Sequence, residues 1–113
     1  MRPMVPIPAR LLTSSCTVRP MGEDPATGYP EPGEPRVIGR VRYELCAGVR
    51  RTPYQTQDGT TGLLFIDAAN SPGAFEVPAG SLVSVDGGPE CCVAACRRYE
   101  DGGRVHHWEV ELR

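Results

Sequence analysis

The sequence predicts an all-β protein, a small antiparallel β-barrel of about six strands with long loops and an extended N-terminal arm. Thirteen glycines and twelve prolines interrupt the 113 residues so often that a helical bundle is excluded, because helix interiors tolerate neither residue well. Between them, short segments alternate apolar and polar side chains with a period of two, as strands with one buried face do. Closure into a barrel is favoured because it leaves no strand edge exposed. The length allows one domain, residues 1–113.

The N-terminal third predicts an arm, a strand and a loop. Residues 1–9 contain three prolines, too many for regular structure, and form the extended arm. In residues 10–18 the side chains alternate with a period of two, as expected for a strand with one more solvent-exposed face. Residues 19–35 hold five prolines and three glycines, so we expect a long surface loop there without a regular element.

Residues 36–47 carry the clearest strand pattern of the chain. We expect one face to be core and the other to meet water or a partner. The core face takes Val37, Val41, Tyr43 and Leu45, and the other face takes Arg36, Arg40, Arg42 and Glu44. Residues 48–62 then form a second long loop, longer than joining two neighbouring strands requires, and loops of that length often serve function.

The C-terminal half predicts the remaining strands. Residues 63–67 form a short apolar strand, and a proline-broken connection, 67–80, follows it. Residues 81–85, 90–99 and 104–113 form a meander through two Asp-Gly-Gly turns. In the last strand the apolar side chains share one face with His106, whereas His107 lies on the exposed face with the glutamates. The candidate core residues of the whole chain are Val41, Tyr43, Leu45, Trp108, Val110 and Leu112.

Charge and hydropathy exclude several classes of partner. All twelve basic residues are arginine, and the net charge of −2 provides no global field for nucleic acid or an anionic membrane. No apolar run reaches the roughly 20 residues that cross a bilayer, and the N-terminus has no apolar leader, so we expect a soluble chain that is not secreted. Arginines at 36, 40, 42, 50 and 51 could contact phosphate. We favour solvated or intersubunit salt bridges, since Glu44, Glu109 and Glu111 are available.

The cysteines and histidines raise two chemical alternatives. The five cysteines are an odd number without an export signal, which favours reduced, mostly buried thiols. A zinc site from Cys91, Cys92, Cys96, His106 and His107 is disfavoured, because neighbours on a strand point to opposite faces. Cys96, His107 and Asp86 could fill the roles of a nucleophilic triad, but any chain of this size offers such a trio. We therefore expect no enzyme, no metal and no cofactor.

Several segments resemble a known family, the small head-closure (stopper) and minor capsid proteins of tailed bacteriophages. The tighter part of the resemblance is FIDAANS at 65–71, VPAGSLVSVDG at 77–87 and VHHWEVEL at 105–112. PARLLTSSCTVRP at 8–20 is similar to the first strand of such proteins. The loops 19–35 and 48–62 depart from the family in length and sequence.

The resemblance implies a structural β-barrel subunit of a homo-oligomeric ring, which we expect to be twelvefold. The ring would sit at the head-tail interface of the virion, between the portal or its adaptor and the tail or tail-terminator proteins, after assembly in the host bacterial cytoplasm. Its loops would narrow the channel through which genomic double-stranded DNA passes. We assign the channel-facing role to loop 48–62, and contacts with neighbouring copies to Arg50, Arg51, Tyr54, Gln55 and Asp58. The alternative is a small OB-like barrel that binds a ligand or an oligonucleotide.

Overall fold

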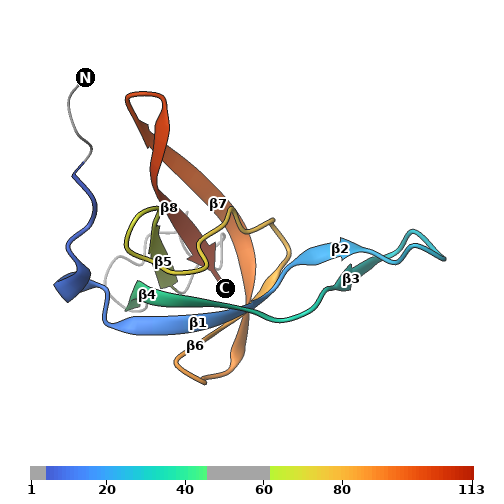
Figure 1. Cartoon of the computed structure of the whole chain (residues 1–113). Helices are drawn as coiled ribbons and strands as arrows, with labels where there is room; N and C mark the ends of the chain where they lie inside the picture. Colours follow the sequence, from blue (N-terminus) through green and yellow to red (C-terminus); the bar gives the residue numbers. More distant parts are fainter. Residues whose placement is uncertain (1–4, 46–61) are drawn as a thin grey trace, which may run out of the picture.

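Six antiparallel strands close into a barrel in the order β1-β4-β5-β8-β7-β6, which confirms the predicted class and architecture (Figure 1). The structure, a computed structural model, describes residues 5–45 and 62–113. A single 3-10 turn, η1 (Ala9–Leu11), precedes the barrel. The barrel strands are β1 (Ser14–Arg19), β4 (Arg36–Leu45), β5 (Gly62–Asp67), β6 (Leu82–Val85), β7 (Glu90–Asp101) and β8 (Arg104–Leu112).

The two tight turns of the C-terminal meander form where Asp-Gly-Gly predicts them. In the turn between β6 and β7, Asp86 and Gly87 both have positive φ angles, and the N–H of Gly88 donates to the carbonyl of Val85 at 2.9 Å. Gly102 and Gly103 have positive φ angles between β7 and β8. Two successive positive φ angles match the right-handed twist of the flanking strands, so both turns set the register of their hairpins.

Apolar side chains of all six barrel strands meet inside the barrel. Trp108 is 8% exposed, and its indole N–H donates to Oε1 of Glu76 at 3.1 Å. Val41, Val110 and Leu112 are fully buried, and Tyr43 packs against the core while remaining half-buried. The core cluster consists of Cys16, Val18, Ile38, Val41, Leu64, Ile66, Val77, Val83, Val93, Trp108, Val110 and Leu112.

The predicted core face of the strand at 36–47 is wrong at both ends. Val37 is 66% exposed and Leu45 is 70% exposed, whereas Ile38 is fully buried. At Val37 the reason is a β-bulge: Ser14 pairs with Val41 and Cys16 with Ile38, so β4 carries one residue more than β1 in the same interval. Leu45 lies beyond the bulge, in alternation with Val41 and Tyr43, and it is exposed at the last position of the strand. The bulge turns both Ile38 and Val41 inward and breaks the alternation that the sequence suggests.

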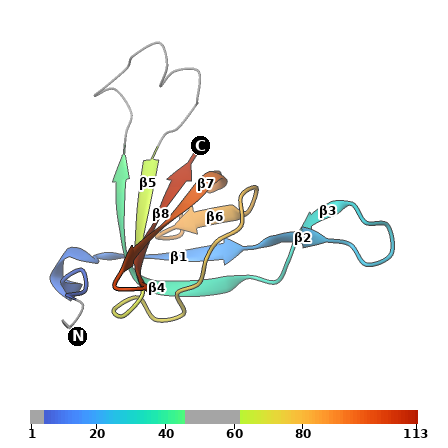
Figure 2. The same ribbon diagram turned by 90° about the horizontal axis from the view of Figure 1, so that it is seen from above.

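Residues 19–35 contain a regular element that we did not expect. β2 (Met21–Glu23) pairs with β3 (Pro30–Pro32) in a separate two-stranded sheet. Residues 20–35, which we call the ribbon, project from the barrel as a continuation of β1 and β4 (Figures 1 and 2). Prolines are tolerated in β3 because they occupy positions whose backbone nitrogens point away from β2 and form no ladder hydrogen bond.

Candidate functional site

The loop to which the sequence assigned contacts with other subunits lies outside the described residues. It includes all five candidate contact residues, Arg50, Arg51, Tyr54, Gln55 and Asp58. The strands that flank it are described: Leu45 at the end of β4 pairs with Gly62 at the start of β5. The two strand ends that the loop joins therefore lie side by side.

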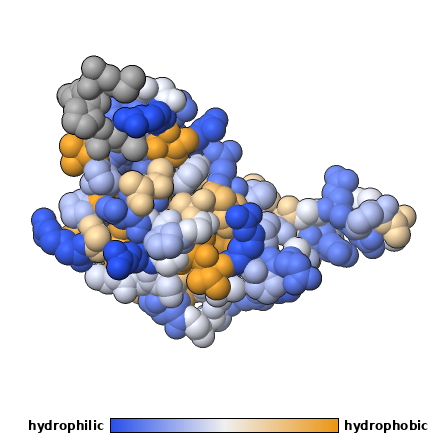
Figure 3. All heavy atoms as spheres, in the orientation of Figure 1, coloured by the Kyte–Doolittle hydropathy of each residue, from blue (hydrophilic) through white to orange (hydrophobic). Residues whose placement is uncertain are grey.

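The ribbon is the part of the described structure that extends farthest from the barrel. In two views it lies on the side opposite the N-terminal arm and η1 (Figures 1 and 2). Residues 20–35 contain four acidic residues, Glu23, Asp24, Glu31 and Glu34, and no basic one. Hydrophilic side chains cover most of its surface (Figure 3). The base is fixed, because the N–H of Met21 donates to Oγ of Ser81 at 2.9 Å.

The tip of the ribbon is built around Asp24. Its Oδ1 accepts the N–H of Ala26 at 2.9 Å, and its carbonyl accepts the N–H of Gly28 at 2.7 Å. The N–H of Asp24 donates to the carbonyl of Tyr29 at 2.8 Å, which closes the turn. The side chain of Tyr29 is 72% exposed, a large aromatic surface held at the end of an ordered turn. Such a side chain is typical of contact surfaces.

The opposite end of the same strand pair carries arginines. Arg10 lies in η1, and Arg40 lies in the bulge of β4, beside the start of β1; both are exposed and form no ion pair within the described residues. Arg42 pairs with Glu44 at 3.1 Å and reaches the carbonyl of Leu11 at 3.4 Å. The strand pair therefore has an acidic end and a basic end.

Asp67, which the sequence marked only as the end of a strand, organises the basic end. Its buried carboxylate accepts the N–H of Ala69 at 3.0 Å and of Asn70 at 2.7 Å, and the N–H of Ile7 at 2.9 Å. The run Asp-Ala-Ala-Asn-Ser was the available signal, since aspartate readily caps the backbone two or three residues later. The hydroxyl of Ser71, which accepts the N–H of Asp67, donates to the carbonyl of Arg40. One network thus supports both the arm and the bulge.

The N-terminal arm lies on its own barrel over the part that is described. In addition to the bond to Asp67, the side-chain amide of Asn70 donates to the carbonyl of Ile7 at 2.8 Å. Ile7 is half-buried, whereas Val5 is exposed. Val5 thus remains available for contact with another molecule.

Two histidines add to the contacts that hold the N-terminal arm on the barrel. Nε2 of His106 lies 2.6 Å from the carbonyl of Val5, and the Nδ1 atoms of His106 and His107 are 2.8 Å apart. Nε2 of His107 lies 3.0 Å from Glu109, and Tyr99 stacks on the ring. His107 is half-buried, so the expectation that it is exposed is wrong.

Other arginines of the barrel form contacts within the chain. The guanidinium of Arg36 lies 3.7 Å from the centre of the Phe75 ring, a cation-π contact. Arg97 pairs with Glu111 at 2.9 Å. Because Glu44 contacts Arg42 and Glu109 contacts His107, all three glutamates proposed for intersubunit pairing have partners within the chain. In each of these arginine contacts at least one of the two side chains is exposed to solvent, so the contact contributes little to the stability of the fold.

The cysteines and histidines do not assemble a metal centre within the described residues. Burial raises the pKa of the Cys16 thiol to about 11 and raises the pKa of Cys96 as well. Asp86, Cys96 and His107 have separate surroundings: the carboxylate of Asp86 accepts the N–H of Ser15, whereas His107 contacts Glu109. The residues proposed as a triad therefore do not form one.

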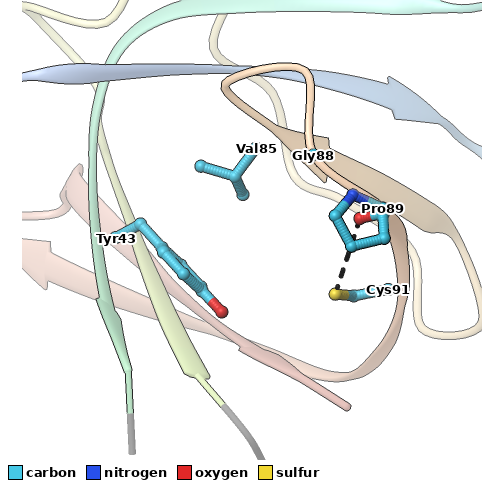
Figure 4. Close-up of a pocket in the computed structure, with 5 residues that line it drawn as sticks. All are labelled: Tyr43, Val85, Gly88, Pro89 and Cys91. Atoms are coloured by element: carbon cyan, nitrogen blue, oxygen red, sulfur yellow. Dashed lines mark hydrogen bonds between the residues drawn. The ribbon is translucent and has the colours of Figure 1, made fainter.

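A small hollow opens at the barrel surface between β4 and the turn before β7 (Figure 4). Tyr43 and Cys91 face it from opposite sides, with Val85, Gly88 and Pro89 completing the lining. The thiol of Cys91 lies 3.9 Å from the carbonyl of Pro89. With a volume of about 90 Å³, the hollow is much smaller than the several hundred Å³ of a typical small-molecule site.

In the part of the chain that the structure describes, no helix has the length and apolar character needed to span a membrane. Residues 8–112 match the family model described as "Minor capsid protein". No curated protein and no solved structure matches the chain.

Proposed function

The chain belongs to the minor capsid protein family, and from that membership we propose that it is a head-closure (stopper) subunit of a tailed bacteriophage. The family makes it a structural component of the virion. In the proposed role, copies form a ring at the head-tail interface, between the portal or its adaptor and the tail or tail-terminator proteins. We propose a twelvefold ring.

The observation that carries this proposal is the polarity of the β1 and β4 strand pair. An acidic ribbon lies at one end and exposed arginines lie at the other. Two unlike surfaces on opposite sides of a subunit suit a head-to-tail contact, and head-to-tail contacts that close generate rings. A two-fold dimer would instead use one self-complementary patch.

The loop between β4 and β5 is the segment that we propose for the DNA channel. Because Leu45 pairs with Gly62, a long insertion at this position leaves the barrel ladder unchanged. In a ring, the same rim of every subunit faces the same way, so one loop per subunit suffices to narrow the channel. Genomic double-stranded DNA would pass this loop, and Arg50, Arg51, Tyr54, Gln55 and Asp58 would link neighbouring loops.

The test is to shorten residues 51–60 to an Asn-Gly turn in the phage. We expect the barrel to fold and the heads to fill, with tails attached poorly or DNA lost from the particles. The measurements are circular dichroism of the purified protein, and tail occupancy and DNA content of particles by electron microscopy and nuclease protection. A matched control replaces the same residues by a glycine-serine segment of equal length. Normal DNA retention and infectivity in the shortened variant would contradict the role of this loop.

The position of the chain in the virion has its own test. We expect mass spectrometry of separated heads, tails and complete particles to find the chain in heads that are competent for tail attachment, and antibody labelling to mark one vertex. Distribution over the whole capsid surface would show a minor capsid role other than head closure.

The OB-like alternative gains no support from the geometry. The OB-fold is a five-stranded, partly open barrel with a binding groove on its strands, whereas this barrel is closed by six strands. The hollow lined by Tyr43 and Cys91 is too small for a nucleotide base and its sugar.

A further inference from the structure

We propose that the ribbon of one copy docks on the arginine end of a second copy, with Glu23, Glu31 and Tyr29 facing Arg10 and Arg40. The inference rests on the proposed ring and names the surfaces by which its subunits meet. It concerns only described residues at the two ends of the β1 and β4 strand pair.

Charge complementarity is the first argument. The whole chain carries a net charge of −2 and the ribbon carries −4, so the other residues together carry +2. Glu23 and Glu31 are exposed and form no ion pair within the described part of the chain. Arg10 and Arg40 are likewise exposed and form no ion pair there. Two acidic side chains without an ion pair thus lie at one end of the β1 and β4 strand pair, and two arginines without one lie at the other end.

The aromatic tip supplies a second kind of contact. Tyr29, which directly precedes β3 at the turn of the ribbon, is 72% exposed in its own chain. A guanidinium group lies favourably over an aromatic face, as Arg36 already does on Phe75 within this chain. An arginine-rich end of a neighbouring copy therefore suits both the acidic and the aromatic side chains of the ribbon.

The backbone of the ribbon restricts how it can dock. The N–H of Gly33 donates to the carbonyl of Pro20, and the N–H of Asp24 donates to the carbonyl of Tyr29. In an antiparallel pair the hydrogen-bonded positions alternate with positions that form no bond across the ladder. Pro30 and Pro32 fall between the hydrogen-bonded positions, where an N–H would point away from β2. Because proline has no backbone N–H, the outer edge of β3 offers no hydrogen-bond donor at these positions to an added strand. The ribbon is thus suited to bind through side chains rather than by sheet extension.

The backbone at Arg40 is the independent observation at the other surface. Arg40 has a φ angle of +50°, a left-handed conformation that is strained for a residue with a side chain. The surrounding structure enforces it: Ser71 donates to the carbonyl of Arg40, and the neighbouring N–H of Gly39 donates to Pro72 at 3.0 Å. Asparagine or glycine would be less strained here. The guanidinium of Arg40 has no ion-pair partner within the described residues, and docking of the ribbon gives it one.

The opposition of the two surfaces makes the contact head-to-tail. β1 and β4 run from the ribbon base at Arg19 and Arg36 to the bulge beside Ser14. A ribbon cannot reach the arginine end of its own barrel, because the strand pair itself separates them (Figure 2). In the proposed ring, each copy gives its ribbon to one neighbour and receives the ribbon of another.

Site-specific photo-cross-linking tests the contact. Tyr29 is replaced by p-benzoylphenylalanine, and both phage particles and the concentrated purified protein are irradiated. Particles and protein prepared from a mixture of isotopically light and heavy chains distinguish links between copies from links within one copy. We expect mixed-isotope peptide pairs that join position 29 to peptides containing Arg10 or Arg40.

The outcomes separate this inference from the proposed function. Links from position 29 to a portal, adaptor or tail protein, or to another region of a second copy, would overturn the docking surface while leaving the connector role intact. Absence of the chain from the head-tail vertex would overturn the connector role, and the links formed by the purified protein would then decide the docking surface alone.

Charge reversal provides a second, independent measurement. We expect Glu31→Arg or Arg40→Glu alone to lower the yield of cross-linked dimer about tenfold, since like charges then face each other. The double variant, with both changes in one chain, should restore much of the yield because positions 31 and 40 again carry opposite charges. Glu100→Arg, at an exposed site on β7 that is not among the residues proposed to meet, is the matched control. A double variant no better than the single ones would contradict the pairing.

Discussion

The backbone N–H of Ile7 donates a hydrogen bond to Oδ1 of Asp67 at 2.9 Å, although sixty residues separate the two in sequence. Asp67 is fully buried, and its carboxylate accepts two further N–H groups from Ala69 and Asn70. A buried charge of this kind is stable only when several donors surround it. The end of β5, the following turn and the arm are therefore held by one side chain.

Replacing this carboxylate tests the anchor. We expect Asp67→Ala to lower the free energy of unfolding by about 3 kcal/mol, because three backbone donors lose their acceptor in a buried site. Urea denaturation measures the loss, and limited proteolysis should cut near Ile7 faster than in the wild type. Glu100→Ala, at an exposed site, is the control and should change neither. Unchanged cleavage near Ile7 would show that the arm is held by other contacts.

The only tryptophan provides a graded test of the core. Trp108→Ala should destabilise the protein by about 3 to 5 kcal/mol, since it removes a large buried side chain. Trp108→Phe should cost less, about 1 to 2 kcal/mol, mainly through loss of the bond from the indole N–H to Glu76. Thermal unfolding followed by circular dichroism measures both. An alanine variant that melts with the wild type would place Trp108 outside the core.

Gly73 tests a close approach between the β5 to β6 connection and β4. Its φ angle is +82°, and an added Cβ would lie 2.6 Å from the carbonyl oxygen of Val37. Gly73→Ala should therefore cost about 2 to 3 kcal/mol, from backbone strain and the clash together. Gly87→Ala is the matched control, because it has a similar φ of +74° and nothing within 4 Å. Equal losses in chemical denaturation would mean that the clash is relieved without cost.

Acid should destabilise the β6 to β7 turn. The N–H of Ser15 donates to Asp86 and, with the hydroxyl of Ser14, lowers the pKa of this carboxyl from its usual 3.8. A lowered pKa in the folded state means that the contribution to stability is complete above about pH 3.8 and is lost as the pH falls through the folded value. Hydrogen bonds from Arg19 likewise lower the pKa of Glu90 from its usual 4.5. The contribution of Glu90 to stability is therefore complete above about pH 4.5 and is lost as the pH falls through the folded value.

Asp86→Asn isolates the charge, since asparagine tolerates the positive φ angle of the turn and retains an acceptor oxygen. We expect the variant to lose less stability than the wild type between neutral pH and about pH 3. Urea denaturation over this range measures the slope. Parallel slopes for the two proteins would show that Asp86 does not respond to acid, and Glu100→Gln serves as the exposed control.

Burial should protect Cys16 from alkylation. Its pKa of about 11 lies two units above the usual 9.0, so about a hundredfold less thiolate is present at pH 8. We expect iodoacetamide to modify Cys16 at least a hundredfold more slowly in the folded protein than in urea, as measured by peptide mass spectrometry. Cys91, which is half-buried beside the hollow, is the internal comparison and should react first. Equal rates for the two would contradict the closed core.

Much of the barrel follows from local sequence. The Asp-Gly-Gly turns and the alternation around Trp108 place β6, β7 and β8 because neighbouring residues decide both the turn and the buried face. The face of β4 does not follow, because the bulge at Arg40 depends on Ser71 and Pro72, some thirty residues away. A single extra residue in a strand moves every side chain beyond it to the other face.

The ribbon and the Asp67 network were missed for a related reason. Five prolines normally argue against strands, but two of them occupy the alternate positions of β3 that need no N–H, and only the pairing with β2 reveals this. Asp67 resembles an ordinary strand terminus until the arm arrives from the other end of the chain. The loop residues chosen as contacts, Arg50 to Asp58, lie outside the described part of the chain and remain a prediction.

The way in which β1 and β4 continue into the ribbon has a mechanical consequence. A force applied at the ribbon tip acts along both strands together, and it tends to slide them past β6 and β5, with which they pair. Ladder hydrogen bonds lie across the strands, so sliding strains all of them at once, whereas peeling would break them one after another. A subunit pulled by its ribbon therefore resists as a whole barrel, and the direction of pull, more than the number of bonds, sets how much tension it withstands.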